Sequence, residues 1–262
     1  MTLRMADDEE LGPIAAAAAE HENRPNVRNA QRVRELAARY AGLDGATLLR
    51  PLIESEFRGR LAVVSSFGAE SAVVLAQIAE IDRRTPVVFL DTGKLFSETL
   101  RYRDRLVARL GLEDVRTVVP DPARLAAADP RAALWLSDPD RCCNVRKVEP
   151  LAAALSGFDA WVSGRKRYHG AARAELPMFE ADDRGRIKIN PVAGWSPSRV
   201  ADELAARNLP RHPLEAAGYL SIGCITCTDR VLPGEDRRAG RWRGQGKTEC
   251  GIHLPRPTRL DP

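Results

Sequence analysis

Aromatic residues are scarce in this chain, at 5% of its 262 residues. Because proteins that bind single-stranded nucleic acid stack bases on aromatic side chains, this scarcity argues against a nucleic-acid partner. Long apolar runs are also missing, since no stretch approaches the roughly 20 consecutive apolar residues that cross a bilayer. The first residues, MTLRMADDEE, are acidic where a secretory signal has basic residues before an apolar run. We therefore expect a cytoplasmic protein without a membrane partner.

The apolar content of 44% is enough for a sizeable hydrophobic core. The length suggests one large domain, or one domain with an appendage. We expect the acidic, alanine-rich residues 1–26 to be disordered and residues 27–232 to form an α/β domain. Residues 233–262 are expected to be a mobile C-terminal tail, because residues 233–251 include five glycines. The sequence leaves the formation of a homo-oligomer open.

Apolar runs of strand length alternate with segments of helical periodicity along the chain. The strands are predicted at residues 61–65, 86–91, 115–119 and 159–163, with a further one at 186–190. The helices are predicted at residues 26–42, 44–57, 71–81, 97–110 and 196–207. Such alternation is typical of βαβ units. We therefore predict an α/β fold, with a parallel sheet covered by helices on both faces.

Three predicted strands end in distinctive residues, and ligands of open parallel sheets bind beyond such carboxyl ends. Residues 65–68 follow the first strand, residues 91–93 the second, and Gly164 with three basic residues the fourth. The first turn precedes a helix N-terminus, where backbone N–H groups favour an anion. It is not a P-loop, because no G-K-[ST] follows it. A tight turn without a ligand explains this segment equally well, and Asp91 is expected to cap a turn.

Positive charge is concentrated between residues 141 and 173, which contain seven Lys and Arg residues and only two acidic residues. The whole chain has a formal net charge of only +4. A local cluster of cations suits a small anionic ligand, because Lys and Arg give charge-assisted hydrogen bonds to phosphate or sulfate. A solvated basic surface is the commoner explanation of such a cluster taken alone.

The five cysteines form two close pairs and one single residue. Cys142 and Cys143 are adjacent, Cys224 and Cys227 form a C-x-x-C step, and Cys250 stands alone. The odd number argues against a disulfide framework, whereas two close pairs suggest metal ligands. Zinc is the usual occupant of such a set. Adjacent thiolates diverge, however, and an iron–sulfur cluster offers each of them a different iron. The spacing slightly favours iron–sulfur, and zinc and inert buried cysteines remain alternatives.

Cys250 lies between two potential cations, Lys247 and His253, each three residues away. Such neighbours lower the pKa of a thiol when the segment is ordered. The glycines before Cys250 would let the thiol reach two partners in turn. An inert cysteine in a frayed terminus is an equally good interpretation of this segment alone.

Six motifs, in family order, resemble those of the assimilatory adenylyl-sulfate and phosphoadenylyl-sulfate reductases. They are Ser65-Ser-Phe-Gly-Ala-Glu70, Leu90-Asp-Thr-Gly93, Cys142-Cys-Asn-Val-Arg-Lys-Val-Glu-Pro150, Gly223-Cys-Ile-Thr-Cys227, Arg238-Ala-Gly-Arg-Trp242 and Lys247-Thr-Glu-Cys-Gly-Ile-His253. The combination of E-C-G-x-H with C-C and C-x-x-C is highly specific. The resemblance implies an adenine nucleotide α-hydrolase-like fold and a [4Fe–4S] cluster held by Cys142, Cys143, Cys224 and Cys227.

The resemblance also implies a reaction. Members with the four cysteines mostly reduce adenylyl sulfate, so this nucleotide is the expected substrate. Cys250 would attack the sulfonyl sulfur, AMP would leave, and thioredoxin or a glutaredoxin-like dithiol donor would release sulfite. The motifs assign the anionic groups of the substrate to Lys147, Arg173, Arg238, Arg241 and His253. They assign the adenosine to Ser65, Gly68, Leu90 and Gly164, and we expect the cluster to have an electrostatic and structural role.

This chain departs from the family pattern at three places, one of which is the short, glycine-rich run between Trp242 and Lys247. Lys94 and Ser97 are unusual in the run after Asp91, and the basic loop is Gly164-Arg-Lys-Arg-Tyr-His-Gly-Ala-Ala-Arg173. The nearest alternative function is reduction of phosphoadenylyl sulfate, or of both nucleotides. More distant alternatives are an iron–sulfur tRNA thiolase of the ATP pyrophosphatase type and a zinc-stabilised binding module.

Overall fold

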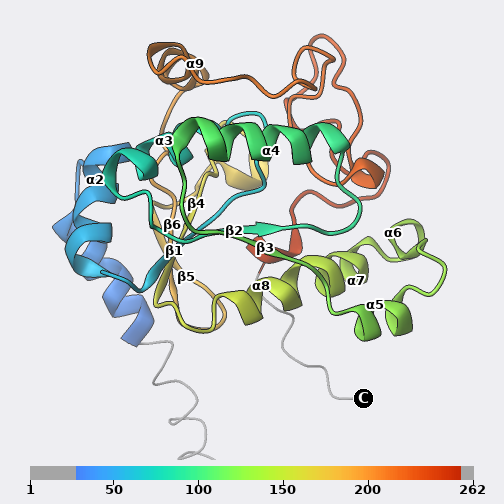
Figure 1. Cartoon of the computed structure of the whole chain (residues 1–262), viewed down its shortest axis with the longest axis horizontal. Coiled ribbons are helices and arrows are strands. Elements are labelled where there is room, and N and C mark those ends of the chain that lie inside the picture. Colours follow the sequence, from blue (N-terminus) through green and yellow to red (C-terminus); the bar gives the residue numbers. More distant parts are fainter. Residues whose placement is uncertain (1–27, 255–262) are drawn as a thin grey trace, which may run out of the picture.

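The structure is a computed structural model that describes residues 28–254 (Figure 1). Six strands form one sheet, in the order β3-β2-β1-β4-β6-β5. They are β1 (Leu61–Val64), β2 (Val87–Leu90), β3 (Val115–Val118), β4 (Ala160–Ser163), β5 (Phe179–Ala181) and β6 (Ile187–Ile189). The predicted disordered segment 1–26 and the last eight residues of the predicted tail lie outside the described part.

The predicted parallel sheet is confirmed, and each predicted strand is present with at most one residue trimmed from either end. Neighbouring strands are parallel from β3 through β6, and β5 pairs antiparallel with β6 at the edge. Sequence analysis missed β5, because its three residues are too few to show a strand period.

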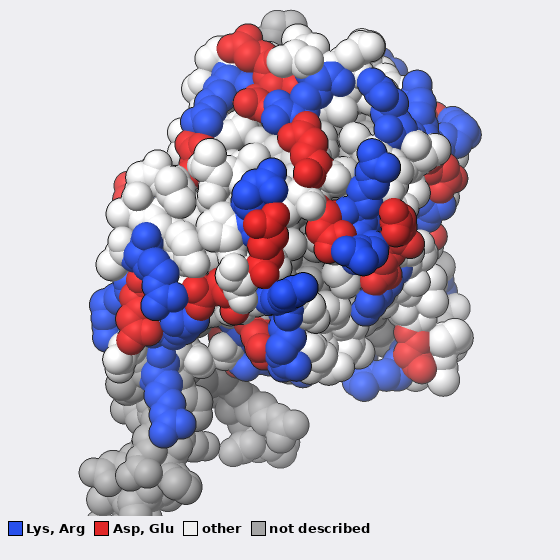
Figure 2. Space-filling view, turned by 60° about the vertical axis from the view of Figure 1, so that its left-hand side comes forward, with Lys and Arg blue, Asp and Glu red and all other residues white. Residues whose placement is uncertain are grey.

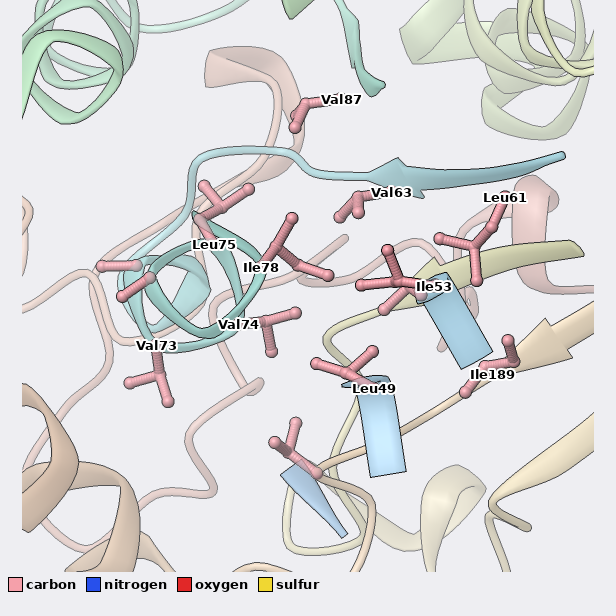
Figure 3. Packing of buried hydrophobic residues seen from close by; sticks show 14 of the residues in the cluster. Leu49, Ile53, Leu61, Val63, Val73, Val74, Leu75, Ile78, Val87 and Ile189 are labelled. Atoms are coloured by element: carbon pink, nitrogen blue, oxygen red, sulfur yellow. The ribbon is translucent and has the colours of Figure 1, made fainter. Parts of the chain in front are cut away.

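Alternate residues of the central strands point to two separate cores, as the two-residue period of a strand requires. In β1, Leu61 and Val63 join the larger cluster, whereas Ala62 joins a smaller one on the other face. The larger cluster contains the apolar residues of α3 (Ser71–Ile81), and Figure 3 shows this helix packed beside β1. The smaller cluster contains residues of α8 (Glu149–Ala154). The sheet is therefore covered on both faces.

The remaining long helices surround the larger core. α4 (Ser97–Leu110) has the predicted bounds, and α9 (Pro197–Ala206) begins after Ser196, whose hydroxyl accepts the Arg199 N–H at 3.1 Å. A helix over residues 28–39 lies within the predicted 26–42. The predicted helix 44–57 is divided into α2 (Gly45–Pro51) and a π-helical turn (Leu52–Glu56).

A string of short helices precedes α8, in a stretch for which the sequence predicted no elements. It consists of α5 (Pro122–Ala128), α6 (Leu134–Ser137), α7 (Pro139–Cys143) and a π-helical turn (Asn144–Val148). The carboxylates of Asp121 and Asp138 cap α5 and α7, and each of these helices has proline at its first position. The chain thereby presents Cys142 and Cys143 at the end of a short helix.

No helix within residues 28–254 is long and apolar enough to span a membrane. On the face shown in Figure 2, basic and acidic side chains alternate without a broad area of one sign. Of the cations assigned to the site described below, Arg173 is buried, and Lys147, Arg238 and Arg241 are partly buried.

Candidate active site

The turn after β1 has a strained backbone. Phe67 has a φ of 48°, in the left-handed region, although it is not glycine. Burial of its ring against Phe89 at a centroid distance of 5.4 Å, and a hydrogen bond from its N–H to the Ser65 hydroxyl, stabilise this conformation. The turn leads into α3 and exposes Ser65 and Gly68 to the cavity beyond the sheet. Strain of this kind is common at ligand-binding sites.

One cavity of about 210 Å³ opens at the carboxyl ends of β1, β2 and β4, the three central strands that carry the distinctive turns. Every residue that the family motifs assigned to substrate or nucleophile lines this cavity: Ser65, Gly68, Leu90, Lys147, Gly164, Arg173, Arg238, Arg241, Cys250 and His253. Their chain positions span 189 residues, and the fold brings them together. Their individual roles stay predictions.

The C-terminal segment closes one side of this cavity. Residues after α9 run mostly as loops and end in two 3₁₀ turns, Ile225–Cys227 and Gly251–His253. Ile252 packs against the smaller core. Gly251 lies close to α7, because a Cβ atom added to it would be 3.7 Å from the Cβ of Cys143. The segment predicted to be mobile is thus docked on the body as far as Leu254, and its mobility stays a prediction.

Cys250 is half-buried and forms a hydrogen bond with the thiol of Cys143. This hydrogen bond, together with the positive charges of Lys147 and Arg241, lowers the pKa of Cys250 well below that of a free thiol, although burial opposes the shift. Because the thiolate is the reactive form of cysteine, this environment fits the predicted role of Cys250 as a nucleophile.

Lys147 lies between the cysteines and the cavity, one turn after Cys143. Burial alone would lower its pKa, but the thiols of Cys224, Cys250 and Cys143 outweigh this effect and raise it. The ammonium group is therefore held in its charged form beside Cys250.

The remaining four cysteines are buried and come from two segments. Cys142 and Cys143 end α7, and Cys224 and Cys227 flank a 3₁₀ turn. Cys142 interacts electrostatically with both cysteines of the second pair, so the two segments meet. Burial raises the pKa of Cys142, so its free thiol is protonated at neutral pH.

Two further observations fit a metal cluster at these cysteines. Trp242 packs on Cys224 and Cys227, and its buried Nε1 has no hydrogen-bond partner within residues 28–254. The Thr92 hydroxyl lies 3.3 Å from the sulfur of Cys224. Both groups could donate a hydrogen bond to a thiolate or a sulfide.

The described residues contain no group of three or more His, Cys, Asp or Glu side chains placed to hold a single metal ion. This finding supports neither a zinc site nor a metal cluster. A four-iron cluster needs a wider set, because each thiolate binds a different iron. The donor set, four buried thiols without histidine, suits iron–sulfur chemistry.

Close backbone approaches place the arginines of the C-terminal segment. A side chain at Gly223 would put its Cβ 2.4 Å from the guanidinium of Arg241, and one at Gly240 would put it 2.2 Å from the carbonyl oxygen of Asp229. Glycine is therefore required at Gly240, where the obstacle is backbone, whereas a side chain at Gly223 would displace the Arg241 guanidinium. Arg241 donates to the carbonyl of Cys227 at 3.1 Å and lies over the ring of Trp242.

Arg173 and Arg238 meet at a carboxylate that sequence analysis left without a role. Nε and Nη2 of Arg173 donate to Glu249 at 2.6 and 2.9 Å, and Arg238 Nη2 lies 3.3 Å from it. Burial raises the pKa of Glu249, but these two guanidinium groups outweigh it and lower the pKa to about 2. Glu249 lies within a recognised motif, but its partner Arg173 is 76 residues away in the sequence. The ion pair could therefore not be predicted from the local sequence.

His253 stacks on Trp161 of β4, with ring centroids 6.2 Å apart and planes inclined by 11°. Burial and the neighbouring cations, Lys188 first among them, hold the pKa of His253 well below its usual value. The imidazole is therefore neutral, and its buried Nδ1 has no hydrogen-bond partner among the described residues. A neutral ring in this position can accept or donate a hydrogen bond without adding charge.

Glu70 was also missed as a functional residue. Its carboxylate lies 3.0 Å from Lys166 and accepts from Tyr168 at 2.7 Å and from Arg237 at 2.9 Å. The partners belong to the basic loop after β4 and to the C-terminal segment. Glu70 therefore links the chain segments that border the cavity. The Asp91 carboxylate accepts a hydrogen bond from the Gly93 N–H, which is the turn cap expected from the sequence.

Comparison with known proteins gives consistent results. Residues 60–230 match the family described as the phosphoadenosine phosphosulfate reductase domain. The chain is 55% identical to the adenosine 5'-phosphosulfate reductase of Mesorhizobium japonicum, over 84% of this chain and 89% of that protein. It is 40% identical to the phosphoadenosine 5'-phosphosulfate reductase of Gloeobacter violaceus, over 75% and 83%.

Among solved structures, the phosphoadenylyl-sulfate reductase of Candida auris in its phosphate complex is similar, with a TM-score of 0.64 and 25% identity. The match covers 76% of this chain and 97% of that one. The predicted fold class is confirmed by this similarity and by the observed sheet.

Proposed function

Because this chain belongs to the phosphoadenosine phosphosulfate reductase domain family, we propose that it reduces adenylyl sulfate to sulfite and AMP through a sulfonated Cys250. The observation that most supports this proposal is the position of Cys250. Its thiol lies beside the positive charges of Lys147 and Arg241 and borders a cavity that combines the nucleotide-type turn after β1 with several cations.

Nucleotide binding would use the two sides of the cavity differently. Ser65, Gly68, Leu90 and Gly164 lie at strand ends and would contact the adenosine, partly through backbone groups. Lys147, Arg173, Arg238, Arg241 and His253 lie nearer the C-terminal segment and would bind the phosphate and sulfonate oxygens. Cations are needed there, because a thiolate must approach a group that already bears negative charge.

The first chemical step would be attack on sulfur. The electron pair of the Cys250 thiolate forms a bond to the sulfonyl sulfur, the bond from that sulfur to the phosphate oxygen breaks, and its electron pair leaves with AMP. Lys147 and the arginines would stabilise the charge that develops on the departing phosphate. Cys250 would remain as an S-sulfonate.

The second step would need a dithiol, for which we propose thioredoxin or a glutaredoxin-like protein. One donor thiolate attacks the Cys250 sulfur, sulfite leaves with the bonding electron pair, and the second donor thiol closes a disulfide and regenerates Cys250. The dithiol supplies both electrons. All five cysteines are free in the structure, which suits the reducing cytoplasm that we propose as its location.

We propose that Cys142, Cys143, Cys224 and Cys227 hold a [4Fe–4S] cluster, which would supply fixed charge and rigidity beside the cavity rather than electrons for the reaction. The buried thiols and the unpartnered Trp242 Nε1 support this assignment. The side chain of Cys143 contacts Cys250, and the carbonyl of Cys227 accepts from Arg241, so a cluster there would fix the positions of both.

The substrate is tested by comparing kcat/KM for adenylyl sulfate and its 3'-phosphorylated form, with thioredoxin as reductant. We expect a clear preference for adenylyl sulfate, as in the name of the relative that is 55% identical. The relative from Gloeobacter violaceus bears the name of the other activity, which makes reduction of the phosphorylated nucleotide the second candidate. A preference for that nucleotide would replace our choice of substrate.

A further inference from the structure

Glu249 immediately precedes the nucleophile, and the proposed reaction gives it no task. Its buried carboxylate accepts from Nε and Nη2 of Arg173 at 2.6 and 2.9 Å. These two nitrogens form the edge with which a guanidinium grips a two-oxygen anion. Glu249 therefore occupies the edge of Arg173 that a phosphate or sulfonate would use.

The surroundings of Glu249 are those of an anion site. Besides Arg173, Arg238 lies 3.3 Å from the carboxylate, and the charges of Arg165 and Lys188 also act on it. Two arginines thus contact this carboxylate at the wall of the cavity, and two further cations, which pair with Glu180, act on it from farther away. Such a concentration of positive charge favours any compact anion that can enter, and not only the one supplied by the chain itself.

The same ion pairs hold the nucleophile segment in place. Oε1 of Glu249 accepts the backbone N–H of Cys250 at 2.8 Å, and Arg238 Nη2 donates to the carbonyl of Thr248 at 3.0 Å. Lys247 pairs with Asp140 of α7, and its side chain is only 5% exposed. Loss of the Glu249 contacts would therefore release the segment that contains Cys250.

We propose that Glu249 is an internal occupant of the anion subsite, which holds the Cys250 segment closed in the free protein and is displaced from Arg173 and Arg238 by the phosphosulfate of the substrate. This inference rests on the proposed function, because it needs an anionic nucleotide. Part of the binding free energy of the nucleotide is then used to displace Glu249, and the segment is loosened when the substrate arrives.

The inference predicts that removing the charge of Glu249 strengthens nucleotide binding. Dissociation constants for AMP, adenylyl sulfate and adenosine are measured on Cys250→Ser protein, purified with its metal content retained, with and without Glu249→Gln. We expect AMP and adenylyl sulfate to bind about tenfold more tightly, or about 1.4 kcal/mol, to the glutamine variant. Adenosine, which has no anionic group, should bind unchanged.

Glu235→Gln is the matched control, because Glu235 lies in the same segment but pairs with Arg243 on the surface. It should leave all three constants unchanged. Unchanged or weaker binding of AMP to Glu249→Gln would overturn the inference while leaving the proposed function intact. If neither AMP nor adenylyl sulfate binds the parent protein, both proposals are wrong.

A second measurement needs no change at Glu249. Trypsin cleavage after Lys247 reports opening of the segment, since this side chain is buried when the segment is docked. Inorganic sulfate should compete for Arg173 and Arg238 and so accelerate cleavage of the Cys250→Ser protein, relative to sodium chloride of equal ionic strength. An equal or slower rate in sulfate would contradict the inference.

Discussion

At the scale of single residues, the cavity combines a thiol that favours ionisation with groups that stabilise negative charge. Lys147 and Arg241 act on Cys250 from two different segments of the chain, and His253 stays neutral because of burial and the neighbouring cations. A neutral histidine beside charged arginines can orient a leaving group without repelling its neighbours. The charge states of Cys250 and His253 thus depend on pKa shifts that the fold creates.

Cys250→Ser separates binding from chemistry. The serine hydroxyl fits the same space but is a far weaker nucleophile at neutral pH, so sulfite release should fall below detection. AMP binding should change by less than about threefold, because the proposed nucleotide contacts come from other residues. Calorimetric titration of AMP and a sulfite assay check the two parts, and sulfite turnover in the variant would point to another nucleophile.

At the scale of elements, buried polar residues fix the loops that surround the cavity. Glu70 joins the start of α3 to the basic loop and to Arg237. His212 joins the loop after α9 to α4, because its Nδ1 accepts the Leu214 N–H at 3.2 Å and its Nε2 lies 3.1 Å from the Thr99 hydroxyl. Loops that would otherwise be mobile are thereby tied to rigid helices.

Glu70→Gln should be strongly destabilising. The change leaves the buried Lys166 without its carboxylate, and breaking a buried pair costs roughly 3–5 kcal/mol. Urea denaturation measures the loss in the free energy of unfolding. Glu80→Gln on the same helix is the control, since the exposed pair of Glu80 with Arg207 should contribute less than about 1 kcal/mol. Equal effects of the two changes would contradict the role of Glu70.

His212 should make the protein less stable as the pH falls. Burial lowers the pKa of His212 to about 4, below the value of about 6.5 expected in the unfolded chain. Between these values the unfolded state binds the extra proton, so the stabilisation is complete above the unfolded pKa and is lost as the pH falls. From about pH 7 to pH 5 the loss should be roughly 2 kcal/mol.

The comparison protein for this test is His212→Gln, which cannot titrate in this range. Its free energy of unfolding, measured by urea denaturation, should fall less between the same two pH values. Carboxylates such as Glu249 titrate in both proteins, so the difference between them isolates the histidine. Parallel pH profiles of the two proteins would show that His212 makes no such contribution.

At the scale of the whole molecule, the two cysteine pairs lie where α7 meets the C-terminal segment. A metal cluster held by both pairs would link two parts of the chain about 80 residues apart, and metal binding of this kind stabilises the folded state. The nucleophile contacts this region through Cys143. Loss of the cluster should therefore affect both stability and activity.

Cys143→Ser should lose iron, sulfide, visible absorbance and sulfite production together, because one of four ligands is gone. Cys250→Ser is the matched control, since it removes a neighbouring thiol that is not a predicted ligand and should keep its iron. Iron and sulfide analysis with a visible spectrum checks both variants. Zinc without iron in the unmodified protein would contradict the cluster.

Much of this architecture could be predicted from the sequence. The strands are short apolar runs that end in unusual turns, and both features are local. Glu249 and Glu70 could not be predicted, because their roles depend on partners such as Arg173 and Lys166 that the fold brings from distant positions. The short helices before Cys142 escaped prediction because their capping aspartates and prolines stand without an apolar period.

The central claim is that the Cys250 sulfur accepts the sulfonate of an activated nucleotide. Intact-mass analysis of the protein mixed with adenylyl sulfate, in the absence of any reductant, tests it most directly. We predict a single adduct with the mass of SO₃, mapped by peptide analysis to Cys250 and released as sulfite on addition of reduced thioredoxin. An unmodified protein, or an adduct on a different residue, would contradict the account.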